Sequence, residues 1–367
     1  MRIVLTGGGT GGHIYPAVAV GKHMQQIDPD TKLLYIGTSN GMESRVVPAQ
    51  SIPFEAVEIT GFRRKLSLEN VKTIIRFLKG VKRSKALLRE FKPDVVVGTG
   101  GYVCGPVVYA AAKLGIPTFI HEQNAIPGLT NQFLSRYADH IGVSFPESKT
   151  QFPKAKETSY TGNPVASNVL RAVPGKGLQS LGLPSGTRLA LIVGGSRGAR
   201  ALNEAVIEMA PQLGRLAGTR VVFVTGDIYY ESTKQRILEL GAGESLTLVP
   251  YLNNMAEVLR DSALVVSRSG ASSLAEITAL GLPSILIPSP NVTNNHQEAN
   301  ARSLVNAGAA ELLLEKDLSG QTLLTMMEKL LRDQERMTAM SGAAMRLAVP
   351  DSAARIAEAL RQLNKSR

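Results

Sequence analysis

The sequence lacks the features of a disulfide-stabilised, metal-cluster or membrane-spanning protein. Its 367 residues include one cysteine, Cys104, so no disulfide can form within the chain and no cysteine cluster can bind a metal. Tryptophan is absent, and aromatic residues make up 5%. No apolar run approaches the ~20 residues of a transmembrane helix. The first strand follows Met1 so closely that no signal peptide is expected. These absences favour a reducing, cytoplasmic location.

Acidic residues are also in short supply. Lysine and arginine number 41 against 30 aspartate and glutamate residues, which gives a formal net charge of +11 and an isoelectric point near 9.7. Such an excess indicates an anionic partner. Nucleic acid, a membrane surface and a phosphorylated substrate are all open at this point.

Short apolar runs alternate with helical patterns along the whole chain. This alternation predicts parallel sheets with right-handed crossovers. The pattern restarts midway, and each half opens with a strand and a glycine turn, GGGTGG at 7–12 and GGSRGA at 194–199. We therefore predict an α/β protein of two tandem Rossmann-like domains, 1–163 and 164–349, with a terminal helix in 350–367 that packs back on the first. The strands are expected at RIVLT, KLLYIGT, DVVVGTG, IPTFIHEQ and HIGVSF, then at RLALIVGG, VVFVTG, LTLVP, SALVVSRSG and PSILIPSP.

The first glycine turn allows two interpretations. Gly7, Gly9 and Gly12 match G-x-G-x-x-G between a strand and a helix, where glycines let a diphosphate approach the main chain. A dinucleotide site would also need an acidic residue at the end of the second strand. That strand ends LLYIGTSN, without one. A tight turn without a ligand is the structural alternative.

The second half offers a stronger nucleotide site in SRSGASSLAE, residues 267–276. Ser269 is expected to cap a helix whose first backbone N–H groups suit a diphosphate. Glu276 lies inside that helix, where a carboxylate can accept two hydrogen bonds from a ribose diol. An ordinary capped helix with a solvated glutamate is the alternative.

Two polar loops follow other strands. HEQNAIPGLTN at 121–131 would direct Glu122, Asn124 and Asn131 toward a ligand at the carboxyl end of the sheet, where open α/β sheets bind ligands. PSPNVTNNHQEANA at 288–301 carries amide and imidazole side chains suited to sugar hydroxyls. Both stretches could equally be turn-forming loops.

Several motifs together resemble the MurG family of bacterial peptidoglycan UDP-N-acetylglucosamine transferases. They span nearly the whole chain in the family's order: GGGTGGH, GTGGYVCGP, HEQN, TGNP, GGSRGA, SRSGASSLAEI and NHQEANA. The resemblance implies the two-domain GT-B fold, with its sheets facing each other across a cleft. It also implies transfer of GlcNAc from UDP-GlcNAc to the C4 hydroxyl of MurNAc in undecaprenyl-pyrophosphoryl-MurNAc-pentapeptide (lipid I). The product is lipid II, formed with inversion and without a metal or other cofactor.

The resemblance implies substrate-binding roles for individual residues. One position departs from the family, because Ala166 stands where some members carry an arginine that contacts the donor; Arg197 or Arg200 could replace it. The positions carried over are Thr10, Gly11, Gly12, Asn124, Ser196, Leu252, Ala271, Ser272, Ser273, Glu276 and Gln297, to which Asn131 and His296 are added from their loops.

His13 closes the first glycine turn. An inverting transfer needs the acceptor hydroxyl deprotonated as it attacks, and it needs the departing UDP stabilised. An imidazole titrates near neutral pH, so His13 is the predicted catalytic base and Glu122 the alternative. His13 could instead position the acceptor or the loop, or simply fill space. Without a metal, a helix dipole with serine and arginine groups would stabilise UDP.

Residues 62–92 carry most of the excess charge, with eleven lysine or arginine residues and two acidic ones. A basic amphipathic stretch can lie on anionic lipid. Nucleic acid is less favoured as the partner, because aromatic residues that could stack on bases are not interleaved with the cations. We predict peripheral attachment to the cytoplasmic face of the bacterial membrane. The alternative is an apolar stripe packed on the sheet, with solvated cations. Gly80 is expected to break the helix. The predicted membrane residues are Lys72, Ile75, Arg76, Leu78, Lys79 and Arg83, with Val71, Ile74 and Val81 sharing the apolar stripe.

Two rival functions stay open on the sequence alone. A UDP-GlcNAc 2-epimerase-like protein would need neither a lipid acceptor nor the basic stretch. A basic protein that only binds nucleotide sugars or nucleic acid would not need a positioned His13.

Overall fold

The computed structural model describes residues 1–60, 68–195, 198–216, 218–242 and 246–365, with only the backbone for 68–72. The chain forms two compact units. Unit 1 comprises Met1–Val165 and Asp351–Arg367, and unit 2 comprises Ala166–Pro350. The chain thus passes between units after residues 165 and 350, where the sequence suggested boundaries at 163 and 349.

Unit 1 contains a seven-stranded parallel sheet in the order β3-β2-β1-β4-β5-β6-β7. The strands other than β3 and β7 are buried along all or all but the first of their residues, as expected for a sheet covered on both faces. The short strands β3 and β7, FEA and TSY, carry no apolar run and were not predicted. The strands are β1 (Arg2–Thr6), β2 (Lys32–Gly37), β3 (Phe54–Ala56), β4 (Val95–Gly98), β5 (Thr118–Glu122), β6 (His140–Val143) and β7 (Thr158–Tyr160).

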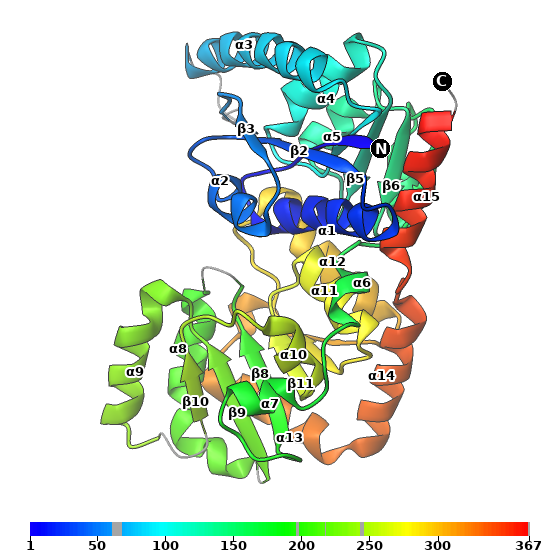
Figure 1. The fold of residues 1–367 in the computed structure, drawn as a ribbon. Coiled ribbons are helices and arrows are strands. Elements are labelled where there is room, and N and C mark those ends of the chain that lie inside the picture. Colours follow the sequence, from blue (N-terminus) through cyan, green and yellow to red (C-terminus); the bar gives the residue numbers. More distant parts are fainter. Residues whose placement is uncertain (61–67, 196–197, 217, 243–245, 366–367) are drawn as a thin grey trace. The chain divides into compact units, whose positions relative to one another are not determined.

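The last helix of the chain belongs to unit 1 and packs across its first helix (Figure 1). Ile356 and Leu360 of this helix join the core formed by Ile14 and Val18. Ser352 Oγ at its start donates a 2.7 Å hydrogen bond to the Asn163 carbonyl. The helices of unit 1 are α1 (Gly11–Ile27), α2 (Glu43–Val46), α3 (Leu68–Phe91), α4 (Cys104–Lys113), α5 (Leu129–Leu134) and α15 (Ser352–Lys365).

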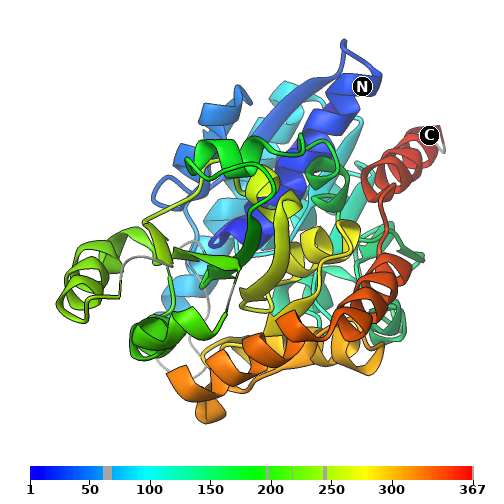
Figure 2. The same cartoon turned by 90° about the horizontal axis from the view of Figure 1, so that it is seen from below.

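Unit 2 contains a six-stranded parallel sheet in the order β10-β9-β8-β11-β12-β13. Its strands are β8 (Arg188–Val193), β9 (Thr219–Val224), β10 (Leu246–Val249), β11 (Ser262–Ser267), β12 (Ser284–Leu286) and β13 (Glu311–Leu312). Its helices are α6 (Ala166–Val169), α7 (Lys176–Ser180), α8 (Arg200–Met209), α9 (Tyr230–Glu239), α10 (Met255–Arg260), α11 (Ala271–Ala279), α12 (His296–Asn306), α13 (Gly320–Arg332) and α14 (Gln334–Leu347). Figure 2 shows α13 and α14 in orange, following one another; both contribute to the core of this unit. The two-residue strand β13 was not predicted.

The two sheets share one topology, and it fixes where a ligand can bind. In each sheet the strand order reverses at the first strand: β1 lies between β2 and β4, and β8 lies between β9 and β11. Open parallel sheets bind ligands at this reversal, beside the carboxyl ends of the strands. The loops after β1 and β4 are therefore the candidate ligand-binding loops of unit 1, and the loops after β8 and β11 are those of unit 2. The predicted pair of Rossmann-like α/β domains is confirmed.

Helix α3 runs unbroken through Gly80, so the predicted break there is wrong. Gly80 is buried where the helix passes Val57 and Pro106; a Cβ on it would lie 3.2 Å from a side-chain carbon of each. The glycine thus permits close packing instead of ending the helix.

Candidate active site

Unit 1 has two glycine turns, the first after β1 (residues 7–12) and the second after β4 (residues 98–101), and they are packed directly against each other. Gly8 N donates a 3.3 Å hydrogen bond to the Gly100 carbonyl, and Thr99 Oγ1 donates a 2.7 Å bond to the His13 carbonyl. Gly101 has a φ of +82°, and a Cβ there would lie 2.2 Å from the Gly8 oxygen. Only glycine fits such a position. The loops after β1 and β4 therefore form one supporting structure.

His13 lies in the first turn of α1, half-buried, with its ring over Gly100. A Cβ on Gly100 would lie 2.9 Å from His13 Cδ2. His13 Nδ1 lies 3.0 Å from the Gly8 carbonyl oxygen and 3.4 Å from Thr10 Oγ1. Because a carbonyl oxygen only accepts hydrogen bonds, the neutral ring that makes the shorter contact has its proton on Nδ1. Its Nε2 then carries the lone pair, as a base requires.

A buried glutamate that the sequence did not single out holds the same turn. Gly9 N donates to Glu43 Oε2 at 3.2 Å, while Thr38 donates to Oε1 through its backbone N–H at 3.1 Å and its hydroxyl at 2.5 Å. The side chain of Glu43 is fully buried. A single glutamate in the four-residue helix α2 belongs to no recognisable motif, so only the folded chain shows this contact.

Glu122 is buried at the end of β5, and both its carboxylate oxygens are occupied. Oε1 accepts hydrogen bonds from Asn124 N at 3.0 Å and Asn124 Nδ2 at 3.2 Å. Oε2 accepts from Gly128 N at 3.0 Å and Asn131 Nδ2 at 2.8 Å. Glu122 therefore organises its own loop, and its surroundings do not fit the alternative catalytic base. Asn131 is buried as well, and its Nδ2 group supports this loop. Asn124 is half-buried.

The loop after β5 is tied to the second glycine turn. Gln123 Nε2 donates to the Thr99 carbonyl at 2.8 Å and lies 3.1 Å from His121 Nδ1. His121 Nε2 lies 2.9 Å from the Gly162 carbonyl. Burial lowers the pKa of His121 to about 4, so this imidazole is neutral near pH 7 and serves as a structural link.

In unit 2, helix α11 begins beside the carboxyl end of β11 with Gly270 as its N-cap and no side-chain cap. The buried Ser269 instead donates through Oγ to the Gln297 carbonyl at 2.8 Å, so the predicted Ser269 cap is wrong. The first N–H groups of a helix have no partner within the helix and carry its positive dipole end. The start of α11, with Ala271, Ser272 and Ser273, can therefore bind an anion.

Polar side chains share the face of α11 that turns away from the core. The core side of the helix consists of Ala271, Leu274, Ile277 and Thr278. Ser272, Ser273 and Glu276 follow one another at helical spacing on the other side.

Two groups on this face have no partner among the residues that the structure describes. No residue that the structure describes forms a hydrogen bond or ion pair with the Glu276 carboxylate, which is partly buried. Burial raises the pKa of Glu276 to about 7 from its usual 4.5. The Ser272 hydroxyl is likewise buried without a described partner. Desolvated polar groups of this kind are typical of ligand sites.

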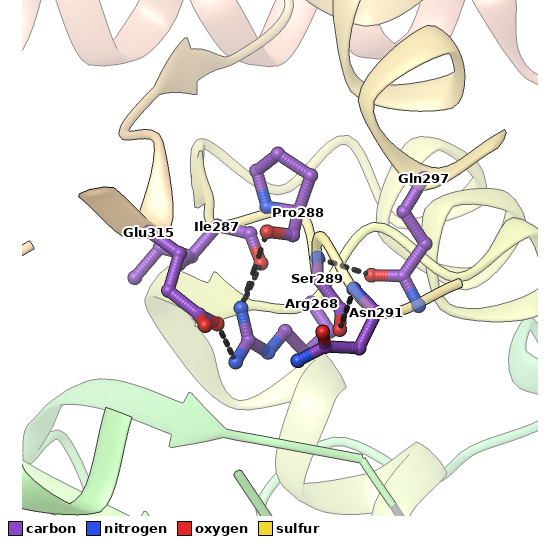
Figure 3. Close-up of polar contacts among 7 residues, drawn as sticks. All are labelled: Arg268, Ile287, Pro288, Ser289, Asn291, Gln297 and Glu315. Carbon is purple, nitrogen blue, oxygen red and sulfur yellow. Dashed lines mark hydrogen bonds and ion pairs between the residues drawn. The ribbon is translucent and has the colours of Figure 1, made fainter. Parts of the chain in front are cut away.

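An arginine absent from the sequence prediction joins the ends of two strands beside α11 (Figure 3). Arg268 donates to the carbonyls of Ile287 and Pro288 at 3.0 and 3.2 Å and forms an ion pair with Glu315. The contacts of its guanidinium are thus with backbone carbonyls and a side chain of unit 2. This contact stabilises the carboxyl ends of β11 and β12.

Gln297 and His296 begin α12 next to this arrangement. Gln297 Oε1 accepts a 2.9 Å hydrogen bond from Ser289 N, and its Nε2 points away from Ser289 (Figure 3). His296 Nδ1 lies 2.7 Å from the Thr293 carbonyl. The Nε2 donor of Gln297 therefore takes no part in the contact with Ser289. His296, by contrast, contacts the turn that precedes α12.

The other predicted positions have varied surroundings. Thr10 is exposed, and Gly11 and Gly12 open α1. Leu252 and Ala166 are buried, and Arg200 is exposed at the start of α8. Ser196 and Arg197 lie outside the described residues.

Two family models match most of the chain. The glycosyltransferase family 28 N-terminal domain matches residues 3–143, and the corresponding C-terminal domain matches residues 189–356. The chain belongs to glycosyltransferase family 28. It is therefore an enzyme of the glycosyltransferase class, as the sequence predicted.

Curated relatives match this family 28 chain from end to end. A UDP-N-acetylglucosamine–N-acetylmuramyl-(pentapeptide) pyrophosphoryl-undecaprenol N-acetylglucosamine transferase of Bacillus cytotoxicus is 52% identical over 365 residues, covering 100% of both chains. The Bacillus subtilis protein of the same name is 50% identical with the same coverage. The predicted membership of the MurG family is confirmed.

Solved structures agree with this fold. The crystal structure of Acinetobacter baumannii MurG has a TM-score of 0.78 and 30% identity, covering 98% of this chain and 99% of that one. This match confirms the GT-B fold class. A putative UDP-N-acetylglucosamine 2-epimerase from Listeria monocytogenes has a TM-score of 0.74 over 100% of this chain and 97% of that one, at 16% identity. At that identity the likeness concerns the fold alone, so it gives the rival epimerase interpretation no further support.

Proposed function

We propose that this chain transfers GlcNAc from UDP-GlcNAc to the C4 hydroxyl of MurNAc in undecaprenyl-pyrophosphoryl-MurNAc-pentapeptide, with inversion at the anomeric carbon. One observation carries this proposal: relatives named for this transfer match the chain along its whole length at about half identity. The product is lipid II, a precursor of peptidoglycan.

Unit 2 supplies the donor site in this proposal. The UDP diphosphate binds at the start of α11, where N–H groups and the hydroxyls of Ser272 and Ser273 meet it. The Glu276 carboxylate accepts hydrogen bonds from the ribose diol. Its lack of a described protein partner and its raised pKa support this role. Gln297 contacts the sugar through its Nε2.

Unit 1 supplies the catalytic base. His13 Nε2 removes the proton from the acceptor C4 hydroxyl as that oxygen attacks the anomeric carbon and the bond to UDP breaks. The proton on Nδ1 is bonded to the Gly8 carbonyl, so the resulting imidazolium keeps this contact. The negative charge that develops on UDP is stabilised by the helix end and by hydroxyl donors.

The proposal assigns no metal to this reaction. Within the described residues, no group of three or more histidine, cysteine, aspartate or glutamate side chains could hold a metal ion. The Asp-Pro-Asp at 28–30 has a structural role, because Asp28 accepts hydrogen bonds from the Met1 amino group and from Thr31 Oγ1, at 3.2 and 3.0 Å.

The proposed function is tested by measuring UDP release from labelled UDP-GlcNAc with and without a lipid I analogue, each in the presence and in the absence of EDTA. We expect UDP release only with the acceptor and at a rate that EDTA does not change. Formation of UDP-ManNAc without acceptor would instead identify an epimerase. Binding of UDP-GlcNAc without turnover in either condition would identify a binding protein.

We also propose that α3 attaches the protein peripherally to the anionic cytoplasmic face of the membrane. The alternative of a packed apolar stripe does not describe Ile74, Ile75 and Leu78, which are 50%, 49% and 61% exposed. Large apolar side chains at the surface beside exposed cations suit a lipid interface. Val81, by contrast, is buried and belongs to the packed face. No described helix is long and apolar enough to cross a membrane.

The cations of α3 differ in their surroundings. Arg76 donates to Thr60 Oγ1 at 3.1 Å, and Arg83 forms a 3.1 Å ion pair with Glu55. Lys79 is exposed, whereas the side chains of Lys72 and Val71 lie outside the described residues. Exposed ion pairs are weak, so Arg83 can exchange its partner for a lipid phosphate.

Vesicle binding tests this attachment. We expect the protein to bind vesicles that contain anionic lipid, and to bind less as salt rises, since the Debye length is ~10 Å at 0.1 M. The variant with Lys72, Arg76, Lys79 and Arg83 changed to Glu should lose binding yet turn over a short, water-soluble acceptor analogue almost normally. Replacing Ile74, Ile75 and Leu78 with serine should also weaken binding without lowering the Tm.

A matched control separates local from overall charge. Changing four exposed cations of unit 2 to Glu alters the net charge equally and should leave most vesicle binding intact. Equal binding by the α3 variant and the parent would show that its cations are only a solvated face. The control residues are Lys176, Lys234, Arg302 and Arg332.

A further inference from the structure

One peptide group in the first glycine turn joins two ionisable side chains. The Gly8 carbonyl lies 3.0 Å from His13 Nδ1, and the N–H of the same peptide group, that of Gly9, donates to Glu43 Oε2 at 3.2 Å. The order is therefore carboxylate, peptide N–H, peptide carbonyl, imidazole N–H. Hydrogen bonds in such a chain polarise one another. The carboxylate makes the Gly8 oxygen a better acceptor for the proton on His13.

The local structure is shaped around this contact. A Cβ on Gly8 would lie 2.6 Å from Glu43 Oε1, and one on Gly41 would lie 2.3 Å from both Glu43 oxygens. Glycines at these two positions leave space for the Glu43 carboxylate beside the turn. All three hydrogen bonds at Glu43 are donated to it, an arrangement that suits the ionised form, which only accepts.

Two other buried titratable groups at the two glycine turns do not supply a charge. Burial raises the pKa of Tyr35 well above its usual value and that of Cys104 to about 12, so both are neutral near pH 7. Tyr15 and Tyr102 lie beside the turn at Gly11 and Gly9. Glu43 is thus the carboxylate that the structure places in contact with the first glycine turn.

We propose that Glu43 is a positioning residue of the transfer reaction, acting on His13 through the Gly8–Gly9 peptide group. It fixes the proton of neutral His13 on Nδ1, leaves the lone pair on Nε2, and stabilises the imidazolium formed when Nε2 takes the acceptor proton. The arrangement corresponds to a carboxylate–histidine pair with a peptide group between its members. The inference rests on the proposed role of His13 as the base.

The inference predicts an effect on His13 that is visible without turnover. Free histidine favours the tautomer protonated on Nε2, whereas here neutral His13 should be protonated on Nδ1. Replacing Glu43 with glutamine removes the charge but keeps the size. We expect the Nδ1 preference to weaken and the pKa of His13 to fall by about 0.5–1 unit, the effect of one charge at this range in a partly solvated site.

The experiment is nitrogen-15 NMR of the histidine rings across a pH titration of the free protein. The chain has five histidines, and a His13→Ala spectrum assigns the ring of interest. Glu122→Gln is the matched control, because Glu122 is also buried and holds a loop in unit 1 but has no recorded contact with the Gly8–Gly9 peptide group. It should leave the tautomer and pKa of His13 unchanged.

Kinetics add a second readout. In Glu43→Gln, kcat should fall by roughly 10-fold, the acid limb of the kcat/KM profile should move to lower pH with the pKa of His13, and the KM for UDP-GlcNAc should hardly change. Glu43→Asp keeps the charge and should recover part of the loss. If Glu43→Gln does not fold, Gly41→Ala displaces the carboxylate without removing it and should weaken the Nδ1 preference.

The outcomes separate this inference from the proposed function. Neutral His13 protonated on Nε2 in the parent, or an unchanged His13 tautomer and pKa in Glu43→Gln, would overturn the role of Glu43. Normal turnover by His13→Ala would instead remove His13 as the base, while the NMR result would still decide whether Glu43 controls its tautomer.

Discussion

Replacing His13 with alanine is expected to lower kcat by ~100-fold or more, the usual contribution of a general base. The affinity for UDP-GlcNAc should hardly change, because the proposed donor site lies in unit 2 and His13 in unit 1. Single-turnover rates with saturating donor and acceptor, together with donor affinity by calorimetry, measure both effects.

Two further variants serve as controls for this result. His13→Gln keeps a hydrogen-bonding side chain but cannot accept and hold the proton, so it should be as slow as His13→Ala. His23→Ala removes the other histidine of α1 and should keep near-normal kcat. A near-normal kcat with a raised acceptor KM in His13→Ala would assign His13 to acceptor positioning. Glu122 could then serve as the base only by giving up hydrogen bonds that hold its loop.

The second large effect is expected at Glu276. Glu276→Ala should weaken UDP-GlcNAc binding by about 1.5–3 kcal/mol, the range for hydrogen bonds to a charged group, or roughly 10- to 150-fold. Glu239→Ala, which removes an exposed carboxylate of α9 in the same unit, should have no effect. Unchanged donor affinity by calorimetry in a folded Glu276→Ala variant would exclude the ribose contact.

The pH dependence of donor binding follows from the same residue. Burial raises the pKa of Glu276 in the free protein to about 7, and in the proposed donor site the ionised carboxylate binds the ribose diol. Donor affinity should therefore rise as the pH increases through about 7 and fall below it, with proton release on binding at low pH. Glu276→Gln should abolish this dependence. UDP-GlcNAc suits the measurement, since its diphosphate diester does not titrate in this range.

The fold could be predicted from the sequence because most of the longer buried strands are continuous apolar runs. RIVLT and RLALIV read as strands without any partner in view, and each precedes a glycine turn that marks a sheet of its own. The strands it missed, such as β13 with two residues, have too few side chains to form a pattern. The break predicted at Gly80 was wrong because glycine in a helix can serve close packing as well as termination.

The site was predictable where a motif carries the chemistry and unpredictable where the contact is long-range. GGGTGGH and SRSGASSLAE placed His13 and Glu276 in the helices that follow β1 and β11, as the structure shows. Glu43, by contrast, lies 34 residues from Gly9 in sequence, and nothing local indicates their contact. Ser269 could be read as a cap because capping depends only on neighbours, whereas its actual partner, the Gln297 carbonyl, is 28 residues away.

The most direct measurement for the central claim is the linkage of the product. The protein is incubated with UDP-GlcNAc labelled with carbon-13 at C1 and a lipid I analogue, and the product is examined by NMR. The account predicts a β-linked GlcNAc whose labelled carbon correlates with H4 of MurNAc, because an inverting attack on the α-linked donor gives the β-anomer. An α-linked product, attachment at another hydroxyl, or label recovered only in UDP-sugars would contradict it.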